Sequence, residues 1–156
     1  MTFDVIYLDG LHTFEQTYRD LINALNILEP GGLILIDDVF PCDQYSFIPD
    51  YNRALRERSL ATSENPLKHV HWHGDVFKVM AMVHDFHFGL EYRTFWGSGN
   101  EQAVVWESAP QQRLSRFKDI KSISSISYSQ LLENQDILFK DSEENIFKLL
   151  HGIFKD

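Results

Sequence analysis

The chain contains two short apolar runs in which polar and apolar positions do not alternate. They are residues 3–8 (FDVIYL) and residues 33–36 (LILI). A strand that is covered on both faces has such a nearly continuous apolar pattern, which is typical of parallel sheets. Both runs are therefore predicted to be strands of a parallel sheet.

The residues between these runs have the spacing of an amphipathic helix. One helical face would carry six apolar side chains, namely Phe14, Tyr18, Leu21, Ile22, Leu25 and Leu28. Thr13 and Gln16 have capping-box spacing at its start, and the Glu-Pro-Gly-Gly sequence at 29–32 is expected to end it. Residues 3–37 are thus predicted to form a strand–helix–strand unit with a right-handed crossover.

The middle of the chain predicts two further helices and a hairpin. Helices are expected over residues 50–60 and 75–86, each with an aspartate as the cap at its first position, and residues 61–69 are expected to be a loop. Residues 90–96 (LEYRTFW) and 102–107 (QAVVWE) are predicted to pair as an antiparallel hairpin. The glycines of WGSGN, which joins these runs, are interpreted as the hairpin turn.

The last part of the chain, residues 111–156, predicts a helical tail that packs on the same domain. Two residue pairs have capping-box spacing, Ser127 with Gln130 and Asp141 with Glu144. The second pair precedes a helical face formed by Ile146, Phe147, Leu150, Ile153 and Phe154.

Composition narrows the possible partners. A chain of 156 residues that is 44% hydrophobic can bury one core. Its formal charge of −9 and the lack of a long Lys/Arg cluster argue against nucleic-acid or anionic-membrane binding. Cys42 is the only cysteine, which excludes an intramolecular disulfide and makes the cytoplasm the expected location. No apolar stretch has the length of a membrane span, and residues 1–10 lack the basic start of a signal peptide.

Carboxylates follow both predicted parallel strands. Asp9 comes directly after the first strand, and Asp37 and Asp38 come directly after the second. Because the carboxyl ends of parallel strands open on the same edge of a sheet, these side chains are expected to converge. Carboxylates gathered at one point repel one another unless a hard cation such as Mg²⁺ or Ca²⁺ neutralises them.

His12 lies three residues after Asp9, within reach of a cation held there. This position suits a general base. The alternative is that each aspartate serves only as a turn residue or helix cap, and that His12 is an ordinary loop histidine.

The stretch FDVIYLDGLHTFEQTYRDLINALNILEPGGLILIDDV, at residues 3–39, closely resembles part of class I S-adenosylmethionine-dependent methyltransferases. It is similar to their fourth strand, the following helix and their fifth strand, and in particular to the metal-dependent O-methyltransferase branch that includes catechol- and macrolide-sugar-type enzymes. HGDVFKV, at residues 73–79, resembles the helix that precedes the last two strands of that fold, and the hairpin suits those strands.

This resemblance implies a fold and a set of site residues. The fold is an α/β, partial Rossmann-like sheet with equivalents of strands 4, 5, 7 and 6, in which residues 1–110 form the C-terminal half of a methyltransferase-like domain. Asp9, Asp37 and Asp38 would bind Mg²⁺, and His12 would be the general base. The acceptor would be a small hydroxylated molecule.

The cofactor-binding half of the family pattern, three earlier strands and a glycine-rich loop for S-adenosylmethionine, has no counterpart in this sequence. The chain is therefore expected to be a fragment or truncated form of such an enzyme. The alternative is a non-catalytic dimeric interaction module on a degenerate methyltransferase scaffold. In the complete fold the strand at 3–8 would have a further neighbour, so its open edge predicts a homodimer through residues 3–8.

Two further groups of residues leave alternatives open. His69, His71 and His73 would share one face of a strand and could bind a transition metal, or they could lie in a partly exposed loop. Trp72 and Trp96 could line an acceptor pocket or belong to the core.

Overall fold

The computed structural model describes residues 1–62, 71–97 and 100–153. Its centre is a four-stranded sheet in the order β1-β2-β4-β3. The strands are β1 (Phe3–Leu8), β2 (Leu28–Ile36), β3 (Leu90–Gly97) and β4 (Asn100–Glu107). β1 and β2 are parallel, whereas β4 runs antiparallel to both of its neighbours, β2 and β3. The predicted α/β class, the first parallel pair and the hairpin are confirmed.

Helix α1 (Phe14–Leu25) connects the two parallel strands, but it ends earlier than the sequence pattern predicted. Residues 28–32 form the first part of β2 instead of the helix stop, and Leu28 pairs with Phe3 on β1. The pairing shifts register between Phe3 and Val5, and Gly31 has a φ of 80° within the extra length of β2. A glycine tolerates this backbone conformation without a Cβ clash, so the strand continues through the irregularity.

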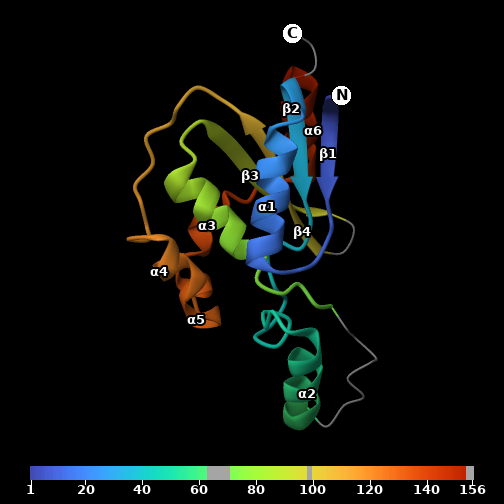
Figure 1. The fold of residues 1–156 in the computed structure, drawn as a ribbon, viewed down its shortest axis with the longest axis vertical. Helices are drawn as coiled ribbons and strands as arrows, with labels where there is room; N and C mark the ends of the chain where they lie inside the picture. The colour runs from blue at the N-terminus through green and yellow to red at the C-terminus, as the bar shows by residue number, and fades with distance from the viewer. Residues whose placement is uncertain (63–70, 98–99, 154–156) are drawn as a thin grey trace.

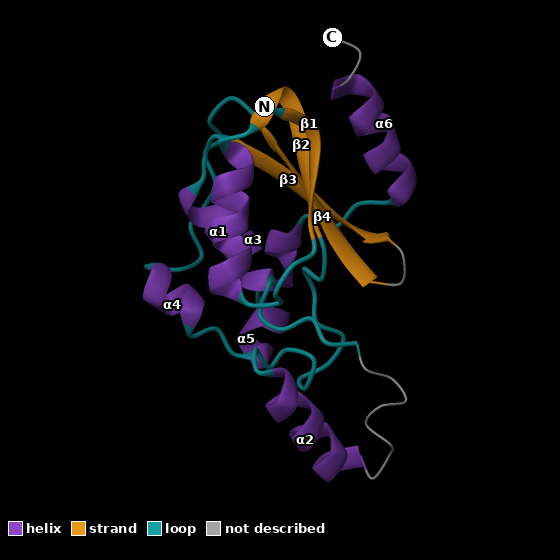
Figure 2. Cartoon of the chain, turned by 45° about the vertical axis from the view of Figure 1, so that its right-hand side comes forward, coloured by secondary structure: helices purple, strands orange, loops and turns teal. Residues whose placement is uncertain are grey.

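Helices cover the sheet on both faces (Figure 2). Helices α1 and α3 (Phe77–Phe86) lie on one face, and α6 (Glu143–Ile153) lies on the other. Residues 77 to 85 of α3 are all buried, as expected for a helix that is enclosed on every side. The main core joins α1, α3 and the sheet, and its largest fully buried members include Leu21, Ile34, Phe77, Met80 and Tyr92.

Asp75 caps a different helix from the one that the sequence predicted. Its carboxylate accepts a hydrogen bond from the backbone N–H of Phe14, the first residue of α1, at 2.7 Å. The same carboxylate pairs with buried Lys78 at 2.9 Å. Thr13 makes no side-chain cap, and Gln16 bonds to Asp20 instead of closing a capping box. Asp75 therefore joins the start of α1 to α3.

The tail contains short helices that contribute buried side chains to the main core. They are α4 (Ile120–Ser124), α5 (Tyr128–Glu133) and a 3₁₀ helix, Gln135–Leu138. The Ser127–Gln130 capping box is confirmed. The predicted Asp141–Glu144 box is wrong, because at the start of α6 the hydroxyl of Ser142 accepts the backbone N–H of Asn145. Asp85 of α3 accepts backbone hydrogen bonds from Arg116 and Phe117 at 2.9 and 2.6 Å, which fixes the path of the chain into the tail.

Helix α2 (Tyr51–Thr62) lies beyond the carboxyl ends of the parallel strands, away from the sheet (Figure 1). Asp50 caps it as predicted, because its carboxylate accepts the backbone N–H of Arg53 at 2.7 Å. The helix includes residues 61 and 62, and the rest of the predicted loop at 61–69 lies outside the described residues. Within the described ranges, no helix combines the length and apolar character needed to cross a membrane.

Candidate metal and catalytic site

The two parallel strands end side by side, as the sequence predicted. Leu8 pairs with Ile36, and the carbonyl of Leu8 accepts the backbone N–H of Asp37 at 3.0 Å. Asp9 and Asp37 are therefore the first residues beyond a shared edge of the sheet. The loop that leads from β1 into α1 adds His12 to this edge.

Three of the four predicted site residues form a compact cluster. One ligand atom from each of Asp9, His12 and Asp38 lies within 4.8 Å of the others. Nε2 of His12 is 3.5 Å from Oδ1 of Asp9, and Nδ1 of His12 is 3.0 Å from Oδ2 of Asp38. Asp38 is buried and has a φ of 57°, a left-handed conformation that costs an L-residue free energy and that Asp adopts more readily than most residues.

The surroundings of His12 orient its Nδ1–H and stabilise the protonated imidazole. Nδ1 faces two acceptors, the carbonyl of Trp72 at 2.7 Å and the carboxylate of Asp38, so Nδ1 is the nitrogen that donates. The ring stacks on Trp72 with a centroid distance of 5.0 Å. Nε2 is left to face Asp9. The hydrogen bond to Asp38 outweighs the effect of burial and raises the pKa of His12 to about 9.

Gly74 lets the chain segment before α3 pack directly against His12. Gly74 has a φ of 58°, and a Cβ added there would lie 1.7 Å from the carbonyl oxygen of His12. The backbone N–H groups of His73 and Gly74 both donate to the carbonyl of Ser46, at 3.2 and 2.8 Å. Trp72 and His73 are thereby held against the site by backbone contacts.

Asp37 lies beside the cluster and is joined to it through a hydrogen-bond network that includes Asn100. Its carboxylate accepts from the hydroxyl of Tyr7 at 2.6 Å and from the amides of Asn100 and Gln102 at 2.7 and 3.1 Å. The amide of Asn100 also donates to Asp38 at 2.6 Å. Burial tends to raise the pKa of Asp38, but the hydrogen bonds from His12 and Asn100 outweigh it and lower that pKa. Tyr7, Asn100 and Gln102 are site residues that the sequence pattern did not indicate.

The three histidines of residues 69–73 have separate environments. His69 lies outside the described residues, and His71 is exposed. His73 is buried, and its Nε2 lies 3.7 Å from Oδ1 of Asp38, on the opposite carboxylate oxygen from His12. Within the described ranges, Nδ1 of His73 has no hydrogen-bond partner. Burial lowers the pKa of His73, although the charge of Asp38 opposes this effect.

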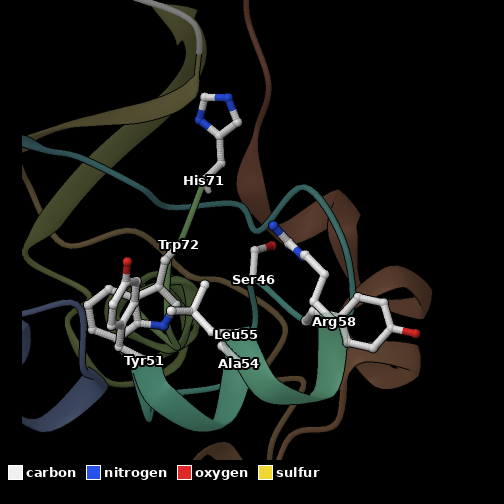
Figure 3. Close-up of a pocket in the computed structure, with 8 residues that line it drawn as sticks. Ser46, Tyr51, Ala54, Leu55, Arg58, His71 and Trp72 are labelled. Carbon is white, nitrogen blue, oxygen red and sulfur yellow. The ribbon is translucent and has the colours of Figure 1, made fainter. Parts of the chain in front are cut away.

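A small pocket adjoins the cluster, with Trp72 as the shared wall (Figure 3). Its cavity volume of about 10 Å³ is far below the range of ligand pockets and has room for about one water molecule. Trp72 meets Tyr51 edge to face at 5.3 Å, and its indole N–H donates to the carbonyl of Ile48 at 2.7 Å. Arg58, at the other end of the pocket, pairs with Asp43 at 2.6 Å. Trp96, the second predicted pocket residue, is 63% exposed on β3.

These donors fit a divalent cation, because carboxylates and imidazole are common ligands for such ions. Asp9 and Asp38 each place a carboxylate oxygen within 4.8 Å of the imidazole of His12 and of each other, and the amide of Asn100 donates to Asp37 and Asp38. With a pKa of about 9 the imidazole of His12 holds its proton near neutral pH, so it can act as a base only when a bound cation offsets the carboxylates of Asp9 and Asp38. The arrangement therefore suits metal binding and general-base chemistry at one place.

Comparison with known proteins gives one family match. Residues 1–39, a quarter of the 156-residue chain, match a family model described as a methyltransferase domain. No curated protein and no solved structure matches the chain. The matched segment spans β1, α1 and β2 and contains Asp9, His12, Asp37 and Asp38. This match supports a methyltransferase domain in the part of the chain that carries the site.

Proposed function

We propose that this chain is part of a divalent-cation-dependent O-methyltransferase that uses S-adenosylmethionine and acts on a small hydroxylated acceptor. The observation that carries the proposal is the cluster of Asp9, His12 and Asp38 beyond the ends of β1 and β2, inside the segment that matches a methyltransferase domain. An aspartate that follows a strand is often only a turn residue or a cap. The position of this cluster, at the ligand-binding edge of the sheet and within the matched segment, favours a catalytic site instead.

The sheet topology supports the same assignment. The strand order β1-β2-β4-β3, with β4 antiparallel to both neighbours, is the order expected if these strands correspond to strands 4, 5, 7 and 6 of the resembled fold. Among the described residues, no glycine-rich turn opens a helix. We infer that S-adenosylmethionine is held mainly by a complementary segment and that this chain supplies the metal and acceptor side of the site.

In this proposal Asp9 and Asp38 bind the cation, and Asp37 supports them through the amide of Asn100. The bound cation would lower the pKa of the acceptor hydroxyl and orient it. Nε2 of His12 would take the hydroxyl proton once the cation offsets the carboxylates that raise its pKa, while its Nδ1–H stays directed to Trp72 and Asp38. S-adenosylmethionine, when bound, would supply the methyl group, with the bond from the acceptor oxygen to carbon forming as the bond from carbon to sulfur breaks and a neutral thioether leaving.

Calorimetric titration of the chain with Mg²⁺, followed by S-adenosylmethionine, tests this function. Asp38→Asn removes one ligand charge with little change in shape, and Asp4→Asn makes the same charge change on exposed β1 away from the cluster. We expect the Asp38 variant to lose about ten-fold or more in cation affinity and the Asp4 variant to behave as wild type. If wild type binds no divalent cation at millimolar concentration, or if both variants bind alike, the assignment is wrong.

A second candidate function is a dimeric interaction module on a methyltransferase-like scaffold. β1 is at the edge of the sheet, and three apolar side chains on it are exposed, Phe3 by 40%, Val5 by 48% and Tyr7 by 50%. Antiparallel pairing of β1 with a second copy would continue the sheet and cover this surface. Sedimentation velocity at micromolar concentration tests the idea, because a stable monomer would contradict it.

A further inference from the structure

Asn100 joins the two adjacent carboxylates of the site through one side-chain amide. Its Nδ2 lies 2.7 Å from Oδ1 of Asp37 and 2.6 Å from Oδ1 of Asp38. An amide NH₂ group has two protons, so it can donate one to each carboxylate. The reverse orientation would place the amide oxygen against two acceptors, and the hydrogen-bond network therefore determines which way the side chain points. Asn100 thus gives both carboxylates a donor without adding a positive charge that would compete with a cation.

The backbone fixes the position of Asn100. It is the first residue of β4, and the carbonyl of the next residue, Glu101, accepts the backbone N–H of Val39 at 3.0 Å. Val39 directly follows Asp38 in the sequence. The start of β4 is therefore tied to the segment that carries Asp38, which holds the amide in place before any cation binds. Such preorganisation allows a site to select one coordination geometry over another.

The two carboxylate oxygens of Asp38 have different surroundings. Oδ1 accepts the hydrogen bond from Asn100, whereas Oδ2 lies 3.0 Å from Nδ1 of His12. The other ring nitrogen of His12 is 3.5 Å from Asp9, so Oδ2 is on the side of the possible metal ligands. A cation that binds both oxygens of Asp38 must therefore compete with the amide of Asn100 for Oδ1.

We propose that Asn100 is a specificity-determining residue of the cation site, because it limits Asp38 to one metal bond through Oδ2 and thereby favours Mg²⁺ over Ca²⁺. The inference rests on the proposed function, since it concerns the ion of the same site. Ca²⁺ takes about 6–8 oxygen ligands and can bind both oxygens of one carboxylate, whereas Mg²⁺ needs octahedral geometry and keeps several waters beside one or two carboxylates. A carboxylate that offers a single oxygen matches the second pattern.

Calorimetric titration with Mg²⁺ and with Ca²⁺ gives the first test, read as the ratio of the two dissociation constants. We expect wild type to bind Mg²⁺ more tightly than Ca²⁺, and Asn100→Ala to lose about ten-fold of this preference because Oδ1 of Asp38 becomes available. Gln102→Ala is the matched control, because the amide of Gln102 donates to Asp37 at 3.1 Å and to Tyr7 at 3.4 Å. Its ratio should equal that of wild type.

The ratio separates a role in selectivity from a purely structural one. A general loosening of the site would weaken the binding of both ions and leave the ratio unchanged. The role of Asn100 would be overturned by a wild-type chain that binds Ca²⁺ as tightly as Mg²⁺, by an unchanged ratio in Asn100→Ala, or by an equal change in Gln102→Ala.

A crystal structure of wild type at saturating Ca²⁺ gives a second test that needs no folded Asn100 variant. One oxygen of Asp38 should lie about 2.3–2.6 Å from the ion, with the other still bonded to Asn100. Both oxygens at that distance would overturn the proposal. Failure of the proposed function looks different, because wild type would then bind neither Mg²⁺ nor Ca²⁺ at millimolar concentration.

Discussion

The replacement of Gly74 by alanine should push the segment with Trp72 and His73 away from His12, because it adds one methyl group at this contact. Gly74 has a φ of 58°, and its Cβ would lie 1.7 Å from the carbonyl oxygen of His12. No side chain can rotate out of the way, because the opposing atoms belong to the backbone. The segment that carries Trp72 and His73 must therefore move away from His12.

The size of the effect can be separated into two parts. A left-handed conformation costs an L-residue roughly 1–2 kcal/mol, and forcing extra atoms into a packed region costs about 1–3 kcal/mol more. Gly31→Ala isolates the first part, because Gly31 has a φ of 80° but no atom within 4 Å of the added Cβ. We therefore expect the free energy of unfolding to fall by about 2–5 kcal/mol in Gly74→Ala and by about 1–2 kcal/mol in Gly31→Ala.

Urea denaturation followed by circular dichroism at 25 °C measures both losses. The midpoint should fall further for Gly74→Ala than for Gly31→Ala, with similar slopes, if the folded cores remain alike. The thermal midpoint should fall by about 2–4 °C for each kcal/mol lost. Equal losses in the two variants would show that residue 74 does not lie against His12, and would refute the packing argument for this side of the site.

Three further perturbations follow from individual contacts. Lys78→Met should lower the free energy of unfolding, measured by chemical denaturation, by about 3–5 kcal/mol, because it leaves Asp75 buried without its cationic partner. Burial lowers the pKa of His87, whose Nε2 lies 2.9 Å from the hydroxyl of Tyr18, so the unfolded chain binds a proton more readily than the folded one. Stability should therefore fall as the pH drops through about 6.5 towards the lower folded-state value, and His87→Gln should flatten this dependence in denaturation curves at several pH values. Val5→Lys, at an exposed position of edge strand β1, should convert any dimer to a monomer in sedimentation velocity while leaving the fold intact.

Local patterns were sufficient to predict the elements that place the site. The nearly continuous apolar run at residues 3–8 and the helical spacing after it predicted β1 and α1, and the ends of β1 and β2 brought Asp9 and Asp38 together as expected. The first part of β2 was missed because Pro30, Gly31 and Gly32 are typical helix-stop residues. Pairing with β1 overrides that local preference.

Contacts between distant segments had no comparable signal in the sequence. Gly74 is needed because of its closeness to His12, and Asp75 caps α1 from a position 61 residues along the chain. Asn100 reaches Asp37 and Asp38 from β4, and a pattern that marks only strands cannot show this contact. Such partners become visible only when the sheet and the covering helices are assembled.

A crystal structure of the chain with bound Mn²⁺ would test the central claim most directly. Anomalous scattering should place the ion about 2.0–2.3 Å from carboxylate oxygens of both Asp9 and Asp38. Asp38→Asn crystals grown in the same way should lack the peak. An ion bound elsewhere, with the carboxylates of Asp9 and Asp38 still bonded to His12 at saturating Mn²⁺, would contradict the proposal that this edge of the sheet is a metal-dependent catalytic site.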